Sequence, residues 1–231
     1  MRRIAAVVVL AAALHSTLRG LETVYFRTQD GGRVYADVYG SGVDAVILAH
    51  GGRFDKESWA GEAQSLVKAG YRVLAIDFRG YGKSRGPASA DPMSAPLQND
   101  VLAAVRYLRK EGATRVSVVG ASMGGFAAGN AAAMAKPGEI DALVLLGARA
   151  GRDPQKIACP KLFIVARDDA DGSGEKRLPG IQASYDASPQ PKQILVLDGS
   201  AHAQFLFGTP EGPRVMSAIL RFLPKPERRP R

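Results

Sequence analysis

The sequence predicts an α/β fold, with a mostly parallel sheet, helices on both faces and an N-terminal antiparallel hairpin. Three observations predict it. Strand-length apolar runs alternate with longer stretches of helical spacing. The later runs are continuously apolar, as in strands that are buried on both faces. Polar clusters follow the ends of several of these runs, where an open α/β sheet places its ligands.

The first third of the chain predicts the hairpin and two buried strands. Glu22–Thr28 and Arg33–Tyr39 are rich in β-formers and flank an Asp-Gly turn, which predicts an antiparallel hairpin. Ala45–Ala49 and Tyr71–Ile76 are apolar runs of strand length. Between them, Glu57–Ala69 has apolar residues at helical spacing and stops before a glycine, which predicts a helix.

The remaining chain repeats the strand and helix alternation. Leu97–Lys110 has helical spacing after a Pro- and Ser-rich loop, and Gly125–Ala135 is an Ala-rich run that favours a helix. Arg115–Val119, between them, is rich in valine and predicts a buried strand. The further predicted elements are the strands Ile140–Leu146, Lys161–Ala166 and Gln193–Leu197 and the helices Gly180–Tyr185 and Glu211–Phe222.

Length and composition predict one domain. The chain has 231 residues, of which 46% are hydrophobic and 23% are charged, enough for one good core. We assign residues 20–223 to this domain and residues 224–231, which are Pro-rich and basic, to a disordered tail. Much of the formal charge of +9 lies near the two ends, so it gives no argument for nucleic-acid binding.

Residues 1–19 predict a secretory signal peptide or short hydrophobic leader. Two arginines precede the apolar run Ile4–Leu14, and small and polar residues follow it. The run is shorter than the roughly 20 residues that span a bilayer, so we expect no stable membrane span in the mature chain. The leader predicts a periplasmic or secreted protein. An uncleaved anchor or a packed N-terminal helix, with a membrane-anchored or cytoplasmic protein, is the alternative.

Gly120-Ala121-Ser122-Met123-Gly124 has the Gly-x-Ser-x-Gly pattern of a nucleophile elbow. It lies between a predicted strand and a predicted helix, which is the context that this motif requires. Such a sharp turn exposes the serine hydroxyl, and the glycines let strand and helix approach closely. The sequence therefore predicts Ser122 as a nucleophile.

A serine nucleophile needs a base, and the chain offers few candidates. Of three histidines, His202 lies in a loop just after the last predicted strand, where it could reach the elbow. A carboxylate between Ser122 and His202 in the chain would hold the base, and Asp168, Asp169 and Asp171 all follow the preceding strand. Crowded carboxylates repel, so we expect only one of them to face the histidine.

The backbone N–H groups of Met123 and Gly52 are the candidate oxyanion hole. Met123 follows the nucleophile, and Gly52 lies in the loop after the third predicted strand. His50, which precedes that loop, is interpreted as a structural residue that holds the loop by hydrogen bonds, with a role as base as the alternative.

Taken together, these motifs resemble those of the α/β-hydrolase fold enzymes over roughly residues 24–223. The motifs that carry the resemblance are residues 50–52, 77–84, 120–124, 167–169 and 201–202. The resemblance implies Ser122 as nucleophile and His202 as base. The family's acid falls on Asp169, with Asp168 second and Asp171 third.

The resemblance also implies an open site with no lid domain. Many family members insert a helical lid after the strand that corresponds to Ile140–Leu146, whereas here only Gly147–Pro160 separates it from the next strand. Dienelactone hydrolases are similarly compact, but their nucleophile is a cysteine. A serine without a lid favours an esterase-like acyl hydrolase over a lipase or an epoxide hydrolase, the latter needing an aspartate at position 122.

Arg53, Phe54 and Phe205 are the candidate substrate-pocket residues. Phe54 and Phe205, like Trp59 and Phe207, flank catalytic loops, and packing in the core is the preferred interpretation for such aromatic residues. Arg53, Arg149 and Arg152 are interpreted as solvated loop charge, with recognition of a carboxylate-bearing substrate as the alternative.

The sequence thus predicts a carboxylesterase-like serine hydrolase of a small ester or lactone. A peptidase or amidase with the same triad and a non-catalytic binding protein are the alternatives. Cys159 is expected to be a structural residue, and one cysteine with three dispersed histidines offers no zinc spacing. We expect no metal, cofactor, nucleotide or nucleic acid. The oligomeric state stays open.

Overall fold

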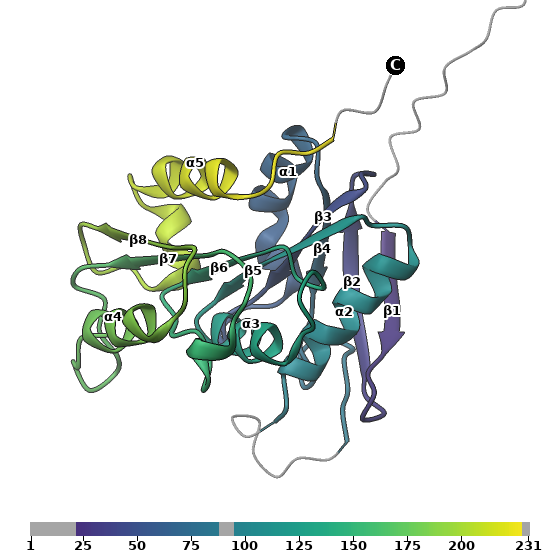
Figure 1. Ribbon diagram of the computed structural model, residues 1–231, viewed down its shortest axis with the longest axis horizontal. Coiled ribbons are helices and arrows are strands. Elements are labelled where there is room, and N and C mark those ends of the chain that lie inside the picture. Colours follow the sequence, from purple (N-terminus) through teal and green to yellow (C-terminus); the bar gives the residue numbers. More distant parts are fainter. Residues whose placement is uncertain (1–21, 88–94, 228–231) are drawn as a thin grey trace, which may run out of the picture.

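The computed structural model describes residues 22–87 and 95–227 (Figure 1). The leader predicted at residues 1–19 and the end of the predicted tail, residues 228–231, lie outside the described residues. Within the described part, no helix has the length and apolar character needed to cross a membrane.

The described residues form one eight-stranded sheet. In chain order the strands are β1 (Glu22–Arg27), β2 (Arg33–Tyr39), β3 (Asp44–Ala49), β4 (Arg72–Ile76), β5 (Arg115–Ala121), β6 (Ala142–Leu146), β7 (Lys161–Ala166) and β8 (Lys192–Leu197). Their order across the sheet is β1-β2-β4-β3-β5-β6-β7-β8. The β1–β2 and β2–β4 pairs are antiparallel and the others are parallel, which confirms the predicted hairpin and parallel sheet.

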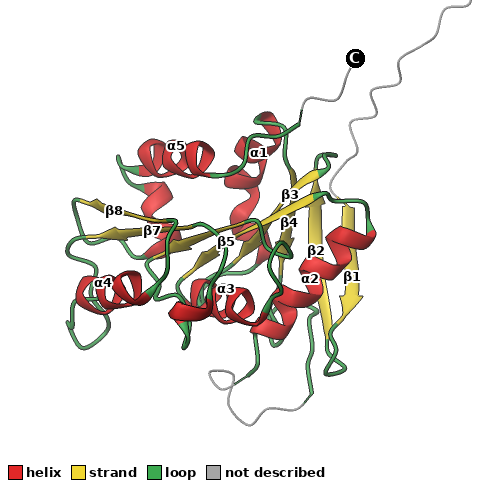
Figure 2. Ribbon diagram, viewed as in Figure 1, coloured by secondary structure: helices red, strands yellow, loops and turns green. Residues whose placement is uncertain are grey.

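Five α-helices cover the sheet in the described residues. They are α1 (Ala60–Lys68), α2 (Gln98–Lys110), α3 (Met123–Met134), α4 (Leu178–Ala187) and α5 (Gly212–Phe222). Helices α1 and α5 lie on one face, and α2, α3 and α4 lie on the other (Figures 1 and 2). Each face has its own apolar core, because the central strands bury side chains in both directions.

The strand register brings several chain segments to one edge. Ala49 at the end of β3 pairs with Ile76 of β4 and with Gly120 of β5. Leu146 at the end of β6 pairs with Ala121 of β5. The loops that follow β3, β5, β6, β7 and β8 therefore meet at the carboxyl edge, where α/β sheets bind ligands.

Two local details differ from the sequence expectation. The helix predicted from Glu57 begins as a 3₁₀ turn, Lys56–Trp59, because the side chain of Asp55 accepts a hydrogen bond from Ser58 N. A second 3₁₀ segment, η3 (Ala203–Gly208), was not predicted. Between β6 and β7 there is only the short 3₁₀ turn Pro154–Lys156, so no helical lid lies at that position.

Residues 224–227 do not behave as the predicted disordered tail. The carbonyl of Pro224 accepts a hydrogen bond from the Tyr71 hydroxyl at 3.0 Å, and that of Lys225 accepts one from Arg115 at 2.6 Å. Glu227 N donates to Asp44 Oδ2 at 2.8 Å. Long-range hydrogen bonds thus hold this segment on the domain, although its Pro-rich sequence gives no local signal of them.

Candidate active site

Ser122 lies at the turn between β5 and α3 in a strained backbone conformation. Its φ is 50° and its ψ is −114°, a region that non-glycine residues rarely adopt. A Cβ at Gly124 would lie 2.3 Å from the Ala49 carbonyl oxygen, and one at Gly120 would lie 2.6 Å from the Gly124 oxygen. Glycine at both positions therefore permits the close approach that this elbow requires.

The structure brings Ser122, His202 and Asp169 together. His202 Nε2 lies 2.7 Å from Ser122 Oγ, and His202 Nδ1 lies 2.7 Å from Asp169 Oδ2. The Asp169 side chain is fully buried, whereas the His202 side chain is 25% exposed. Because a carboxylate accepts the Nδ1 hydrogen, Nε2 is free to accept the serine proton.

Of the three candidate aspartates, only Asp169 contacts His202. Asp168 is exposed and forms an ion pair with Lys176 at 3.0 Å. Asp171 accepts hydrogen bonds from the hydroxyl and the backbone N–H of Ser173, and these lower the pKa of its carboxyl. Asp168 and Asp171 thus contact other residues of their own loop, and Asp169 is the aspartate whose carboxylate contacts His202.

The two candidate oxyanion residues lie beside one another. Met123 is the first residue of α3, so its N–H has no acceptor within the helix. A Cβ at Gly52 would lie 3.7 Å from Met123 Sδ. Tyr81 joins them, because its hydroxyl donates to the Gly52 carbonyl at 3.0 Å and lies 3.6 Å from the same sulfur.

His50 holds the loop after β3 from inside the protein. Its Nε2 accepts a hydrogen bond from Phe78 N at 3.2 Å, so its Nδ1 carries the hydrogen donated to the Gly51 carbonyl at 2.9 Å. The side chain is buried, and burial lowers the pKa of the imidazole. These contacts confirm the structural interpretation of His50.

Two residues that shape the site were not found from the sequence. Gln204 accepts a hydrogen bond from Gly51 N at 2.7 Å and donates to Ser58 Oγ at 2.9 Å. It thereby joins the loop that carries His202 (the histidine loop) to the loop after β3. Gly147 has φ +57°, and a Cβ there would lie 3.1 Å from His202 Nδ1. Only the position of Gly147 at a strand end gave a signal; the contacts of Gln204 join residues far apart in the chain.

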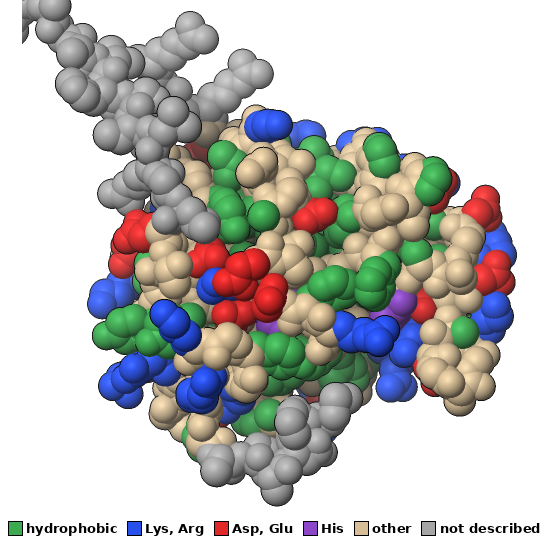
Figure 3. All heavy atoms as spheres, turned by 180° about the vertical axis from the view of Figure 1, so that it is seen from behind, with side chains coloured by type: hydrophobic (Ala, Val, Ile, Leu, Met, Phe, Trp, Pro, Cys, Tyr) green, Lys and Arg blue, Asp and Glu red, His purple; other side chains and the backbone are tan. Residues whose placement is uncertain are grey.

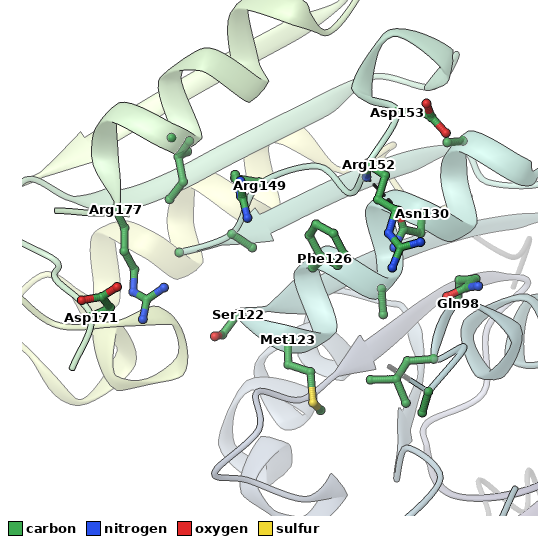
Figure 4. Close-up of a pocket in the computed structure, with 18 of the residues that line it drawn as sticks. Gln98, Ser122, Met123, Phe126, Asn130, Arg149, Arg152, Asp153, Asp171 and Arg177 are labelled. Carbon is green, nitrogen blue, oxygen red and sulfur yellow. Dashed lines mark hydrogen bonds between the residues drawn. The ribbon is translucent and has the colours of Figure 1, made fainter. Parts of the chain in front are cut away.

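A cleft of about 1130 Å³ opens beside Ser122. Helix α3 contributes Met123, Phe126 and Asn130 to its lining, and the segment after β6 contributes Arg149 and Arg152 (Figure 4). Residues that precede and begin α4 close the opposite side. The cleft gives a bound molecule access to the Ser122 hydroxyl.

The candidate pocket residues Arg53, Phe54 and Phe205 do not line this cleft. They come from the loop after β3 and from η3, whereas the cleft lies over α3. Phe54 and Phe205 form a tilted ring pair with centroids 4.9 Å apart, and Phe205 is 48% exposed. The sequence shows which residues follow the motifs around Ser122 and His202, but it does not show on which side of Ser122 this cleft lies.

Neither a reactive cysteine nor a metal-binding cluster is found in the part of the chain that the structure describes. Cys159 is half-buried, and burial raises the pKa of its thiol to about 11. It therefore lacks the thiolate character of a nucleophile. Within residues 22–87 and 95–227, no group of three or more His, Cys, Asp or Glu side chains is placed to hold a metal ion.

Comparison with known proteins gives relatives among hydrolases. The chain is 37% identical over 122 residues to a 2-hydroxy-6-oxononadienedioate/2-hydroxy-6-oxononatrienedioate hydrolase of Cupriavidus pinatubonensis, covering 52% of this chain and 41% of that protein. It is 32% identical to the enzyme of the same name from Burkholderia vietnamiensis, covering 71% of this chain and 57% of that protein. The chain spans about half the length of these curated relatives.

Structural comparison agrees on the fold. An esterase of Pyrococcus furiosus superposes with a TM-score of 0.73 at 23% identity, covering 88% of this chain and 92% of that chain. Residues 44–206, most of the described domain, match the family described as alpha/beta hydrolase fold. With the sheet order, the elbow at Ser122 and this match, the chain belongs to the alpha/beta hydrolase fold family.

Proposed function

We propose that this protein is a serine hydrolase that cleaves a small carboxylic ester or lactone through an acyl-enzyme. The observation that carries the proposal is the pair of 2.7 Å contacts that join Ser122 to His202 and His202 to Asp169. A serine hydroxyl becomes a good nucleophile only when an oriented base takes its proton. Here His202 is positioned to act as the base, and the Asp169 carboxylate is positioned to orient it.

In the proposed reaction Ser122 Oγ attacks the ester carbonyl while His202 Nε2 takes the hydroxyl proton. The carbon–oxygen bond to the leaving group then breaks, and His202 returns the proton to the departing oxygen. Water repeats the sequence on the acyl-enzyme and releases the acid. Asp169 keeps its charge throughout and stabilises the imidazolium through Nδ1.

The developing oxyanion is assigned to the N–H groups of Met123 and Gly52. Met123 follows Ser122 in the chain and starts α3, and Gly52 lies in the loop after β3 against the Met123 side chain. Each such donor typically contributes about 2.7–4 kcal/mol to transition-state stabilisation in acyl transfer. Tyr81 would steady this pair through its contact with Gly52.

Ser122→Ala tests the proposal. With p-nitrophenyl esters from acetate to laurate, we expect kcat to fall by about three orders of magnitude or more, because the nucleophile is lost. Ser65→Ala is the matched control, since Ser65 is a partly exposed serine on α1 whose hydroxyl donates to the Gly61 carbonyl of the same helix. Unchanged turnover in Ser122→Ala would refute the acyl-enzyme mechanism at this residue.

Hydrolysis of 2-hydroxy-6-oxononadienedioate is the second candidate, because the curated relatives are named as hydrolases of that compound. The same serine and histidine would act, so the discriminating measurement is the substrate panel. Turnover of that compound with no turnover of esters would favour this candidate. A peptidase or amidase would be distinguished in the same way with amide substrates.

A non-catalytic binding protein is the alternative from another class. A fluorophosphonate probe separates it, because the probe labels an activated serine whatever the natural substrate is. Labelling of the wild-type protein that is lost in Ser122→Ala supports an enzyme. Absence of both labelling and turnover supports the binding protein.

A further inference from the structure

The cleft beside Ser122 has more cationic than acidic side chains. Five cationic and three acidic residues line it. The two lysines already have acidic neighbours: Lys156 Nζ lies 3.3 Å from Asp153 Oδ2, and Lys176 Nζ lies 3.0 Å from Asp168 Oδ1. The positive charge available to a ligand is therefore that of the arginines that have no acidic neighbour.

Three arginines line the cleft: Arg149, Arg152 and Arg177. Among the described residues, neither Arg149 nor Arg152 forms an ion pair. Arg177 approaches the catalytic carboxylate through Nε, 3.5 Å from Asp169 Oδ1. Figure 4 shows Arg177 to the left of Ser122, Arg149 above it, and Arg152 beside Asn130, farther along α3.

The backbone that carries Arg149 and Arg152 is firmly held, which distinguishes these residues from solvated loop charge. Three hydrogen bonds fix it: Gly147 N to Ile164 O at 2.8 Å, Ala150 N to Ser184 Oγ at 2.9 Å, and Arg152 N to Asn130 Oδ1 at 2.8 Å. Ala148 and Ala150 are buried, so the arginine between them faces the cleft. The stem of Arg149 lies close to Gly180 at the start of α4.

Figure 3 shows the face of the molecule that is turned away in Figure 1, with Lys and Arg side chains beside a histidine and hydrophobic side chains next to them. Of the two histidines in the described residues, His50 is buried and His202 is partly exposed. His202 is therefore the histidine that a ligand can reach.

The cleft accepts the acyl part of a substrate rather than the leaving group. The leaving group must lie against His202 to receive its proton. Ser122 and Met123 line the cleft, whereas His202 does not. An ester held at Ser122 would therefore place its acyl chain over Phe126 and toward the arginines.

We propose that Arg149 and Arg152 form a carboxylate-binding subsite for an acyl chain that ends in a carboxylate, as in a hemi-ester of a short dicarboxylic acid. The planar guanidinium matches a carboxylate with two parallel hydrogen bonds, which makes arginine suited to this group. Phe126 and Met123 supply apolar contacts for the methylene groups between the two ends. This inference rests on the proposed function, whose ester it specifies.

Two substrates of equal chain length test the subsite: mono-p-nitrophenyl glutarate and p-nitrophenyl pentanoate. We expect wild-type kcat/KM to be higher for the glutarate ester, and the ratio between the two to fall at least tenfold in Arg149→Gln/Arg152→Gln, mainly through KM. Arg177 is left in place because it contacts Asp169. A ratio equal to that of the wild type, or no preference in the wild type, would overturn the inference.

Arg106→Gln/Lys110→Gln is the matched control. It removes the same two positive charges from exposed positions on α2 that do not line the cleft, so the ratio should stay at its wild-type value. A similar fall in this control would mean that overall charge, rather than the subsite, attracts the anionic ester.

A calorimetric measurement of glutarate binding to the Ser122→Ala protein tests the subsite without requiring turnover. We expect binding that weakens at least tenfold when Arg149 and Arg152 are replaced, and that weakens as salt is added. If esters are not turned over, the proposed function fails and this binding still decides the subsite. If glutarate does not bind to the Ser122→Ala protein, the subsite is refuted. If esters are turned over without a preference for the carboxylate, the subsite is refuted and the proposed function stands.

Discussion

Gly147 sets the space in which the His202 ring lies. Its positive φ of +57° disfavours side chains, and an added Cβ would lie 3.0 Å from Ala203 N and 3.1 Å from His202 Nδ1. That nitrogen is the one directed at Asp169. The residue that follows β6 therefore controls the contact between histidine and carboxylate without having any side chain of its own.

We expect Gly147→Ala to lower kcat by about tenfold or more, because a misplaced catalytic group is costly even when it moves by only about 1 Å. The left-handed conformation alone should cost about 1–2 kcal/mol in stability. Ester kinetics and chemical denaturation measure the two effects separately. Gly138→Ala is the control, since Gly138 has φ +82° and nothing lies within 4 Å of its added Cβ.

The contrast between these two variants decides the interpretation. Both should lose similar stability, and only Gly147→Ala should lose turnover. Equal turnover in the two variants would show that His202 tolerates the added methyl group and that Gly147 serves only the backbone.

At the scale of elements, η3 joins the histidine loop to the loop that carries Gly52. Gln204, in the first turn of η3, bridges Gly51 N and Ser58 Oγ. Ala203, between His202 and Gln204, has φ 52° and is, with Ser122, one of two non-glycine residues in the described part of the chain with a positive φ. The short element thus fixes two catalytic loops against each other.

We expect Gln204→Met to lower kcat by about tenfold and the free energy of unfolding by about 1–3 kcal/mol. The variant keeps the side-chain length but leaves the buried Gly51 N–H without its acceptor. Ser58→Ala is the control, because it removes the other hydrogen bond of Gln204 and leaves Gly51 N–H accepted. An equal loss of kcat in both variants would place the effect in the Ser58 contact instead.

The elements differ in how much local sequence reveals of them. The central strands were predicted closely because their apolar runs are a local signal of burial on both faces. The 3₁₀ turn at Lys56–Trp59 has a local cap from Asp55 and also a distant contact, since Lys56 N donates to Asp77 Oδ1 at 2.9 Å, and only the first of these lies within the local sequence. Segment η3 is too short for periodicity to show it.

The candidate site divides in the same way. Chain order and motif spacing pointed to Ser122, His202 and a carboxylate among three aspartates, because each follows a recognisable strand. Which side of Ser122 is hollow depends on how α3, α4 and the segment after β6 pack. That packing decides that Arg149 and Arg152 face the cleft while Arg53 does not, and it also places Arg177 in the lining, which no sequence pattern indicated.

At the scale of the whole molecule, Arg79 ties the edge hairpin to the body of the domain. Its guanidinium contacts Asp30 in the β1–β2 turn at 2.6 Å and Asp100 of α2 at 2.6 Å. The Arg79 side chain is 4% exposed and that of Asp100 is 0% exposed. Burial raises the pKa of the Asp100 carboxyl, while the contacts with Arg79 oppose that rise.

We expect Arg79→Met to lower the free energy of unfolding by about 3–5 kcal/mol, because it leaves the Asp100 carboxylate buried without a cation. The Arg79→Met/Asp100→Asn variant should recover part of this loss, since the amide can still accept a hydrogen bond from the backbone N–H of residue 79 while carrying no charge. Chemical denaturation of the two variants and the wild type measures the difference.

The pH dependence of that loss provides a second test. Without Arg79, the folded-state pKa of Asp100 should lie further above its unfolded value, so the folded protein binds the proton more tightly than the unfolded chain does. The stability deficit of Arg79→Met relative to wild type should therefore shrink as pH falls through the raised pKa toward about 4. The Asp100→Asn background should lack this trend. A deficit that is constant with pH would show that the lost packing of the arginine, rather than an unpaired buried charge, governs the stability of this junction.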